Sequence, residues 1–551
     1  MTTRLWQAAR VSLPGVWGGF VGAWLSFTPS LLPRAPMLQG VVVGVSALMG
    51  YAIGVGAAWL WREFADREPR TPSPRAWLVT WLVGAVGGIV ALVWGARFQW
   101  AFFERLGLEH SGWLGELLVP VVGVGLFVVV LALARALRWA ARALGRLLTR
   151  AVGVRAARAG AFVVVCGVAL TLVSGVLWPS ILSSLDSAFA LGEHDTPRGV
   201  SEPTQATRSG SPESLVQFDT LGFQGRAFVG RGPGAADISE YTDEPALEPI
   251  RSYAGVASAA DLEERARLAV DDLERAGGFG RERLLVATPS GTGWVEPSSI
   301  ASFEFLAGGD SATVAIQYSY LPSWMAHIVD HTRARDAGRV LFDEVYSRVS
   351  ALPEQDRPEL YVFGESLGSF GAEAAFSGES DLANRVDGAL FVGPPSFNTL
   401  YRDLVVRRDE GSPEIEPIYR QGRTIRFLSQ PGQVPPGDAE WGDSRVLYMG
   451  HPSDPITWWS PDLLFQRPDW LEEPRGGDVP AAMRWIPLVT FWQVSADMSL
   501  GFSSPPGHGH NYTGDHVDGW AQVLGSDGFD TERLAELRRL IDEEHGAHNF
   551  S

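Results

Sequence analysis

Long uncharged apolar runs fill the first third of the chain. Five of them reach or approach the roughly 20 residues that a helix needs to cross a bilayer core; they cover residues 11–33, 35–61, 76–96, 117–134 and 159–185. The run 117–134 is a little short, but Trp113 and Leu114 extend it toward an interface. We therefore expect an α-helical transmembrane bundle of about five helices, in a domain that covers residues 1–186.

Glycines recur at four-residue spacing within these runs. The pairs are Gly15 and Gly19, Gly18 and Gly22, Gly40 and Gly44, Gly50 and Gly54, and Gly84 and Gly88. Small residues at this spacing let helix backbones approach closely. The pattern therefore predicts a compact bundle rather than separate anchors.

The pattern changes after the last apolar run. Residues 187–213 are polar and rich in Ser, Thr, Pro and Gly, which predicts a linker. From 214 to 551, short β-rich runs alternate with helical patterns, so we expect an α/β domain with a mainly parallel sheet. The expected strands are 284–287, 313–318, 360–363, 388–392 and 445–449, and the expected helices are 262–274, 334–349, 369–376 and 531–544.

Charge is distributed unevenly between these parts. Residues 1–185 hold sixteen arginines and six acidic residues, a net +10, and the whole chain carries −18, which leaves −28 on residues 186–551. Nucleic-acid binding needs clustered positive charge, so no nucleic-acid partner is expected for the acidic domain.

Arginines in the loops between the apolar runs predict the orientation in the membrane. The N-terminus and alternate loops hold thirteen arginines, whereas the intervening loops hold three. Because arginine-rich loops stay in the cytoplasm, five crossings place the α/β domain outside, as the extracytoplasmic part of a multi-pass cell-membrane protein. A regular arginine face, formed by Arg135, Arg138, Arg142, Arg146 and Arg150, either enforces this topology or lies on the anionic inner leaflet.

The most informative motif follows an apolar strand pattern. Residues 360–368 read Leu-Tyr-Val-Phe-Gly-Glu-Ser-Leu-Gly, and a helical pattern with small residues comes next. Strand, sharp Gly-x-Ser-x-Gly turn and helix together are typical of a nucleophile elbow, in which the turn lifts the serine above the sheet. This pattern predicts Ser366 as a catalytic nucleophile; a structural strand-to-helix turn is the plain alternative.

A serine nucleophile needs a histidine base that a carboxylate orients. Asp454 lies in the loop after a later strand pattern, and a glycine-rich loop further on carries His508 and His510. Both follow Ser366 in the order Ser, Asp, His that this kind of fold requires. We predict Asp454 and His510 as the triad partners, with His508 as the alternative base, because the neighbours of His510 lead into a helix that could hold its ring.

An oxyanion hole needs backbone N–H donors at two places. Leu367, the residue after the nucleophile, is the first candidate. The second is Thr292 or Gly293, in the glycine-rich loop after the strand expected at 284–287. A plain glycine turn explains that loop equally well.

Aromatic residues suggest the chemistry of the substrate. Seven of them lie between Asp454 and the histidine loop: Trp458, Trp459, Phe465, Trp470, Trp485, Phe491 and Trp492. Such a group forms an apolar pocket, a surface at the bilayer interface, or simply domain core. On a chain tethered to membrane lipids it favours a lipid-like acyl ester. The candidate substrate-binding residues are Tyr318, Tyr320, Trp324, Trp458 and Trp459.

Other catalytic chemistries find little support. The only cysteine, Cys166, lies in an apolar run, so the chain offers no disulfide framework, no thiol nucleophile and no paired-cysteine metal site. No metal and no cofactor are expected.

Several segments together resemble a known family. They are residues 27–34, 288–294, 317–324, 364–368 and 507–510. In these segments the chain resembles the bacterial, mainly actinobacterial, membrane-anchored alpha/beta-hydrolase family that has its own N-terminal transmembrane domain. The resemblance covers nearly the whole chain and implies a serine-hydrolase fold on a multi-spanning anchor, without naming a substrate.

Three functions remain open at this point. The first is a serine hydrolase of the esterase or lipase type that cleaves an acyl ester of a lipid or cell-envelope substrate. The second is an acyltransferase that passes the acyl group from the same acyl-serine to a sugar or lipid hydroxyl. The third is a non-enzymatic membrane protein whose hydrolase-like domain only binds; a complete set of triad candidates argues against it.

Overall fold

The computed structural model describes residues 11–68, 71–149, 153–177, 180, 192–321, 323–525 and 529–545, with side chains omitted over residues 322–331. The chain forms two compact units. A helical unit consists of Met1–Ser184, Pro461–Leu471 and Val479–Leu500, and an α/β unit consists of Leu185–Ser460, Glu472–Asp478 and Gly501–Ser551. We describe each unit separately.

The helical unit contains the apolar helices that the sequence predicts. They are α2 (Leu13–Leu25), α3 (Pro36–Phe64), α4 (Pro74–Arg105), the short α5 (Gly112–Glu116), α6 (Leu118–Leu148) and α7 (Val154–Leu172), which is followed by a π-turn, Val173–Leu177. Four spans in the described residues are long and apolar enough to cross a membrane: α3, α4, α5 with α6, and α7 with its π-turn. The fifth expected span is shorter in the structure: α2 has 13 residues and ends before the prolines of residues 26–34.

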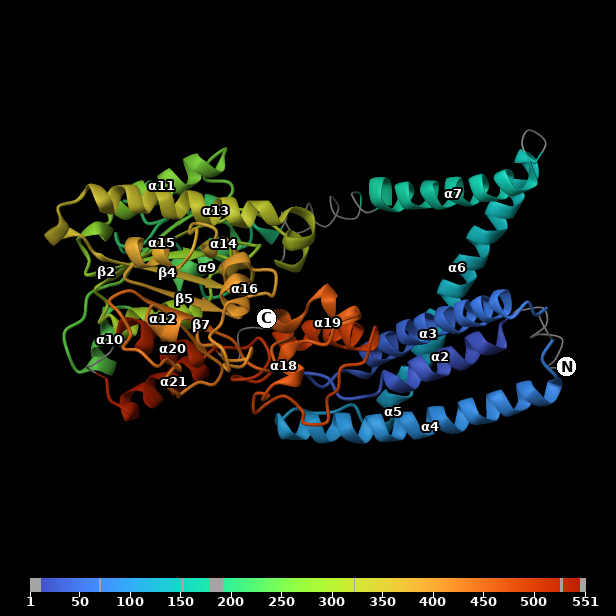
Figure 1. Cartoon of the computed structure of the whole chain (residues 1–551). Helices are drawn as coiled ribbons and strands as arrows, with labels where there is room; N and C mark the ends of the chain where they lie inside the picture. Colours follow the sequence, from blue (N-terminus) through green and yellow to red (C-terminus); the bar gives the residue numbers. More distant parts are fainter. Residues whose placement is uncertain are drawn as a thin grey trace. The chain divides into compact units, whose positions relative to one another are not determined.

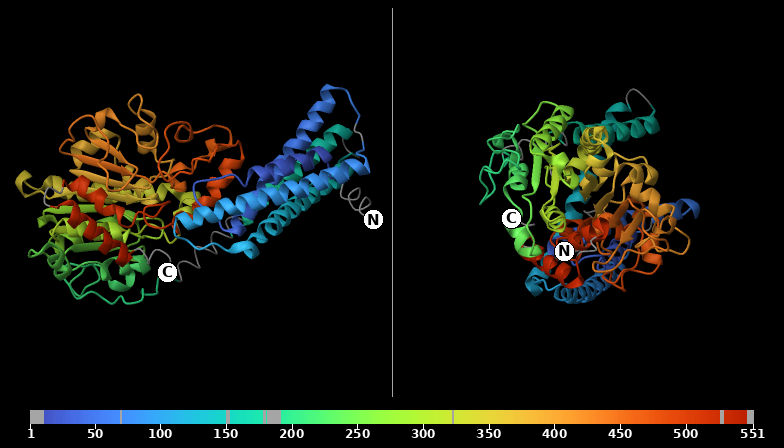
Figure 2. Two further views of the ribbon diagram at one scale, coloured as in Figure 1. Left: turned by 90° about the horizontal axis from the view of Figure 1, so that it is seen from below. Right: turned by 90° about the vertical axis from the view of Figure 1, so that its left-hand side faces the viewer.

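Glycine-mediated packing holds α2 against α3. A Cβ on Gly18 would lie 2.1 Å from the carbonyl oxygen of Gly50, so the two backbones touch. On its other side, α2 packs against α4, where Gly84 faces the ring of Phe20 (Figures 1 and 2). By contrast, Gly88, which the spacing also singles out, faces open space.

Helix α6 extends well past the predicted span 117–134. Its 31 residues form one helix that also carries Arg135, Arg138, Arg142 and Arg146. Because the polar residues that follow the apolar stretch are good helix formers, the helix does not stop where its hydrophobicity does. These four arginines therefore continue the apolar helix rather than form a separate amphipathic segment; Arg150 lies outside the described residues.

The α/β unit is built on a seven-stranded sheet in which every neighbouring pair is parallel. The strands are β1 (Ile250–Ala254), β2 (Arg283–Thr288), β3 (Ser311–Ile316), β4 (Glu359–Glu365), β5 (Gly388–Val392), β6 (Ile425–Leu428) and β7 (Arg445–Met449), in the order β1-β3-β2-β4-β5-β7-β6. All five predicted strands are confirmed, and β1 and β6 are additional. Together with the helical unit, this sheet confirms the predicted fold class.

Helices cover both faces of the sheet, as Figure 1 shows. One face carries α11 (Leu262–Arg275), α13 (Ser323–Ala351) and α14 (Leu367–Glu373), and the other carries α12 (Pro297–Leu306), α20 (Asp515–Leu524) and α21 (Thr531–His545). The remaining helices are α9 (Gly222–Gly230), α10 (Ala235–Thr242), α15 (Glu379–Arg385), α16 (Thr399–Val406), α17 (Pro455–Trp458), α18 (Asp469–Glu472) and α19 (Val489–Gly501). With both faces covered, the central strands are buried and apolar, as parallel sheets require.

The structure refines two expectations about domain organisation. Part of the segment expected to be a linker, 187–213, belongs to the sheet edge: Arg251 in β1 donates its N–H to Thr207 O and accepts the N–H of Ser209. Most of the aromatic insertion belongs to the helical unit, since Pro461–Leu471 and Val479–Leu500 pack there. Trp492, for example, points its Nε1 at Met49 Sδ on α3, 3.0 Å away.

Candidate active site

Ser366 lies at a sharp turn between β4 and α14. Its backbone has φ +54° and ψ −125°, a region that a non-glycine residue adopts only under constraint. The motif glycines permit the turn: a Cβ on Gly364 would lie 2.5 Å from Gly368 O, and a Cβ on Gly368 would lie 2.4 Å from Thr288 O in β2. The predicted elbow therefore has the strained geometry of a nucleophile turn.

Ser366 also contacts the end of the neighbouring strand. Its N–H donates to Val392 O at the end of β5, 2.9 Å away. Leu367 then opens α14, and as the first residue of a helix its N–H has no acceptor within that helix. The nucleophile candidate and its adjacent N–H thus lie at the carboxyl edge of the sheet, where parallel α/β folds place their sites.

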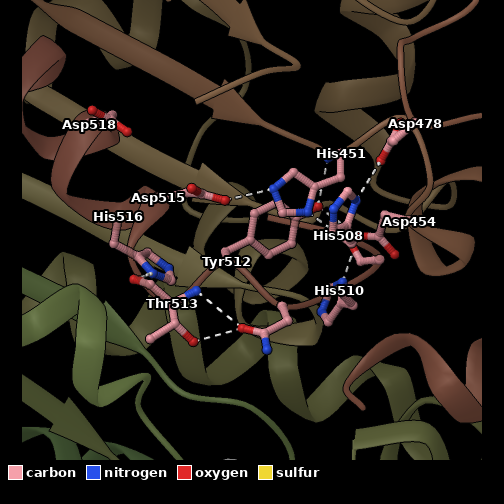
Figure 3. Close-up of polar contacts among 12 residues, drawn as sticks. His451, Asp454, Asp478, His508, His510, Tyr512, Thr513, Asp515, His516 and Asp518 are labelled. Carbon is pink, nitrogen blue, oxygen red and sulfur yellow. Dashed lines mark hydrogen bonds and ion pairs between the residues drawn. The ribbon is translucent and has the colours of Figure 1, made fainter. Parts of the chain in front are cut away.

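Asp454 and His510 form a direct pair in the structure. His510 Nδ1 lies 2.6 Å from Asp454 Oδ2, and both side chains are fully buried (Figure 3). Asp454 is held in place by Tyr512 Oη, which donates to it at 2.7 Å, and by the backbone N–H of Ile456 at 2.8 Å, because Asp454 caps α17. The carboxylate therefore orients the ring and selects the tautomer with the proton on Nδ1.

The surroundings of the other ring nitrogen of His510 differ from those of Nδ1. His510 Nε2 is buried and makes no hydrogen bond to any residue that the structure describes. The ring packs on Gly393, the residue after β5, where a Cβ would lie 2.4 Å from His510 Cε1. Since the backbone N–H of Ser366 binds Val392 O next to this glycine, Ser366 and His510 both contact the end of β5.

His508, the alternative base, lies apart from this pair. Its side chain is 36% exposed, and its partner is Asp478, with Nδ1 to Oδ2 at 3.8 Å. Its neighbour Gly509 is held firmly: its N–H donates to Ser453 Oγ and its C=O accepts from His451 Nδ1. This fixed loop directs His510, not His508, toward Asp454.

The loop after β2 contains the other two residues predicted for the oxyanion hole, Thr292 and Gly293. Ser290 donates its N–H to Trp294 O, and Gly293 donates its N–H to Ser290 O, so Gly293 is occupied within the turn. The N–H of Thr292 makes no hydrogen bond with the described residues, although its C=O accepts from Gln317. Of the three predicted donors, Leu367 and Thr292 remain.

Two further histidines, His451 and His516, lie near the pair (Figure 3), and each has a carboxylate partner. His451 has Gly509 O at 2.9 Å from Nδ1 and Asp515 Oδ2 at 2.8 Å from Nε2. His516 has Thr513 O at 3.1 Å from Nδ1 and Glu365 Oε2 at 2.9 Å from Nε2. An acceptor at each ring nitrogen favours the doubly protonated form of an imidazole, and the pKa values of both rings are raised because their carboxylate partners outweigh burial.

The predictions from the sequence do not include the His516 pair. The ring is fully buried, and its partner Glu365 immediately precedes Ser366 in the chain. Ser298 Oγ links His516 Nδ1 to Glu296 Oε1, at 3.1 and 2.6 Å. His516 and Trp520 lie four residues apart and therefore on one helix face. This spacing next to a large apolar residue is the sequence signal that indicates a buried histidine.

The shifts of pKa follow from these contacts. Burial raises the pKa of Asp454, but His510 outweighs burial and leaves the pKa below its ordinary value. Burial lowers the pKa of His510, but Asp454 outweighs it and leaves that pKa raised. Burial, together with the charge of Glu365, raises the pKa of Glu296 to about 7. An ionised Asp454 beside a neutral, basic His510 is the state that a general base requires.

The predicted substrate-binding residues differ from one another in burial and in their contacts. Tyr318 and Tyr320 follow β3 and so lie in a loop at the carboxyl edge; Tyr318 is buried, and burial raises its pKa. Trp458 is buried and donates Nε1–H to His451 O, which indicates a packing role, whereas Trp459 is half-buried. The side chain of Trp324 lies outside the described residues. Within the described part of the chain, no cluster of histidine, cysteine and acidic side chains is arranged to hold a metal ion.

Comparison with known proteins agrees with the fold. Residues 250–537 match the alpha/beta-hydrolase family, and residues 27–233 match the segment described as the alpha/beta-hydrolase family N-terminus. No curated protein and no solved structure matches the chain. The family match spans more than half of the chain and contains Ser366, Asp454 and His510, so the chain belongs to the alpha/beta-hydrolase family.

Proposed function

We propose that this chain is a membrane-anchored serine hydrolase that cleaves an acyl ester through an acyl-serine intermediate. The observation that carries the proposal is the Asp454–His510 pair, 2.6 Å apart, at the same strand end as Ser366 with its strained turn. Buried ion pairs can be purely structural, but a serine in a strained turn beside such a pair is a functional arrangement.

The reaction would proceed in two stages. His510 Nε2 takes the proton from Ser366 Oγ as that oxygen attacks the ester carbonyl carbon. The oxyanion that forms accepts hydrogen bonds from the N–H of Leu367 and of the loop after β2. The C–O bond to the alcohol then breaks, and His510 gives its proton to the departing oxygen. In the second stage water repeats the attack on the acyl-serine and restores Ser366.

The substrate class follows from the anchor. Four spans are long and apolar enough to cross a membrane. Such an anchor would tether the α/β unit to a lipid surface, where an enzyme meets membrane lipids and envelope esters at high effective concentration. We therefore propose a lipid or cell-envelope acyl ester as substrate, with the α/β unit on the extracytoplasmic side.

Labelling with a fluorophosphonate probe tests the nucleophile. The wild type should form a covalent adduct at Ser366, and Ser366→Ala should not, while its melting temperature stays within a few degrees because a short turn side chain contributes little packing energy. Equal labelling of both proteins would contradict the assignment.

An acyltransferase would use the same acyl-serine, with a sugar or lipid hydroxyl in place of water. Incubation of the purified protein with envelope lipids, followed by mass spectrometry, separates the two reactions. Release of free fatty acid indicates hydrolysis, whereas a new acylated lipid or sugar indicates transfer. If Ser366→Ala and wild type leave every lipid unchanged and neither is labelled, the domain only binds.

A further inference from the structure

The loop between α2 and α3 is buried although much of it is polar. Residues 26–34, here called the proline loop, contain Pro29 and Pro33. Within the loop, Ser26, Ser30 and Arg34 are each at most 2% exposed. Buried polar groups need partners, so the contacts of this loop indicate what it is built to hold.

The main partner of the proline loop is Asp497, on helix α19. Its carboxylate accepts hydrogen bonds from Ser30 Oγ and from the N–H of Leu31, at 3.0 Å, and Arg34 Nε lies 3.5 Å from Asp497 Oδ1. The side chains of Asp497 and Arg34 are fully buried. Burial raises the pKa of Asp497 to about 6, while Arg34 opposes that shift.

A second side chain of α19 contacts the same loop. Gln493 Nε2 donates to Thr28 O at 2.7 Å and to Ser26 O at 3.3 Å. Gln493 and Asp497 are four residues apart and therefore project from one face of the helix. Two polar residues on that face thus fix α19 to the proline loop, entirely within the helical unit.

The far end of the same helix reaches the base. Helix α19 ends at Gly501, whose C=O accepts the backbone N–H of His510 at 3.0 Å. A Cβ on Gly501 would lie 3.3 Å from His510 Cβ, and Phe502 packs edge-on against the imidazole with ring centroids 4.7 Å apart. A single helix therefore carries Asp497 four residues, about one turn, before the residue that supports His510.

We propose that Asp497 is a positioning residue for the general base: by fixing α19 to the proline loop, it fixes the Gly501 carbonyl that holds the backbone of His510. The inference deepens the proposed function and rests on it, because it takes His510 as the base. A shift of about 1 Å in a catalytic group can cost on the order of a hundredfold in rate, so a helix one turn away is close enough to matter.

Asp497→Asn tests this role with little change of volume. The amide cannot pair with Arg34 as a charge, so α19 should loosen. We expect kcat for a short-chain p-nitrophenyl ester to fall about tenfold to a hundredfold with KM unchanged. Ser30→Ala, which removes one hydrogen bond from the opposite side of the contact, should give a smaller loss in the same direction. Ser499→Ala is the matched control, since its hydroxyl bonds only to Ala496 O of the same helix.

Hydrogen exchange gives a readout that does not depend on catalysis. In Asp497→Asn, peptides over residues 501–511 should exchange faster, because the His510 amide loses its fixed acceptor. The expected result is faster exchange there together with a lower kcat, with Ser499→Ala matching the wild type in both. Exchange at 501–511 equal to wild type, or turnover within twofold of wild type, would overturn the inference. If the wild type shows no turnover and no fluorophosphonate labelling, the proposed function fails, and the exchange result alone decides whether the helix holds the loop.

Discussion

His508 and His510 differ by two positions in one glycine-rich loop, yet their surroundings assign them different roles. The side chain of His510 is fully buried against Asp454, whereas His508 is 36% exposed beside Asp478. From the sequence, the preference for His510 rested only on local rigidity. The hydrogen bonds that provide this rigidity come from Ser453 and His451, in the loop after β7. No local sequence pattern predicts these hydrogen bonds.

We predict that His510→Ala lowers turnover of a short-chain ester by about 10⁴-fold, because the nucleophile loses its base. His508→Ala should stay within about tenfold of the wild type, because an exposed ring carries little packing energy. Both variants are compared at equal folded concentration, as judged by circular dichroism. Retained activity in His510→Ala with a large loss in His508→Ala would reverse the assignment.

The charge of Asp454 should be visible in the pH dependence. His510 must be neutral to accept a proton, so kcat/KM rises with pH through the pKa of His510, which Asp454 raises above its ordinary value of 6.5 against the effect of burial. The midpoint of this limb is therefore expected above pH 6.5. Asp454→Asn removes the charge, so the rate should fall and the midpoint should move to lower pH. A midpoint that stays in place would exclude His510 as the titrating base.

At the scale of elements, the sequence predicts five of the seven strands and misses β1 and β6 for one shared reason. Each carries an arginine at its second position, Arg251 or Arg426, which interrupts the apolar run that signals a buried strand. The structure buries both arginines by giving them partners: Arg251 pairs with Glu304 at 2.6 Å, and Arg426 stacks over Trp441. These partners lie far away or in loops, so periodicity alone cannot reveal them.

The contact between α2 and α3 yields a prediction at the same scale. A Cβ on Gly50 would lie 2.0 Å from Gly18 O, and backbone cannot move aside cheaply. Gly50→Ala should therefore lower the stability of the helical unit by about 1–3 kcal/mol, despite the better helix propensity of alanine. Thermal unfolding in detergent measures this change. Gly56→Ala on the same helix is the control, since nothing lies within 4 Å of its Cβ position. If Gly50→Ala melts at the same temperature as this control, the contact between α2 and α3 is loose.

At the scale of the whole molecule, the sequence predicts two consecutive domains and one linker, but the chain alternates between its units after residues 184, 460, 471 and 478, and again after 500. The aromatic insertion gave no decisive signal, because tryptophans suit a pocket, an interface and a core alike. The residues that settle its position are polar: Gln493 and Asp497 match backbone and side-chain groups of residues 26–34. These hydrogen bonds join residues more than 450 positions apart in the chain, so no local sequence pattern can predict them.

The last prediction concerns the orientation of the chain in the membrane, and it does not depend on whether the short helix α2 crosses. At about 1.5 Å per residue, the 13 residues of α2 span about 20 Å, less than a bilayer core of about 30 Å. The loop between α3 and α4 and the end of α6 nevertheless carry most of the arginines, so we expect both in the cytoplasm. On this expectation α7 leads outward whether or not α2 crosses.

A phosphatase reporter that is active only outside the cytoplasm should therefore work when fused after residue 192 and fail when fused in the turn between α6 and α7. The same reporter placed at the N-terminus shows separately whether α2 completes a crossing. Reporter activity at the fusion between α6 and α7, together with no activity at the fusion after residue 192, would place the α/β unit in the cytoplasm and exclude an extracytoplasmic substrate.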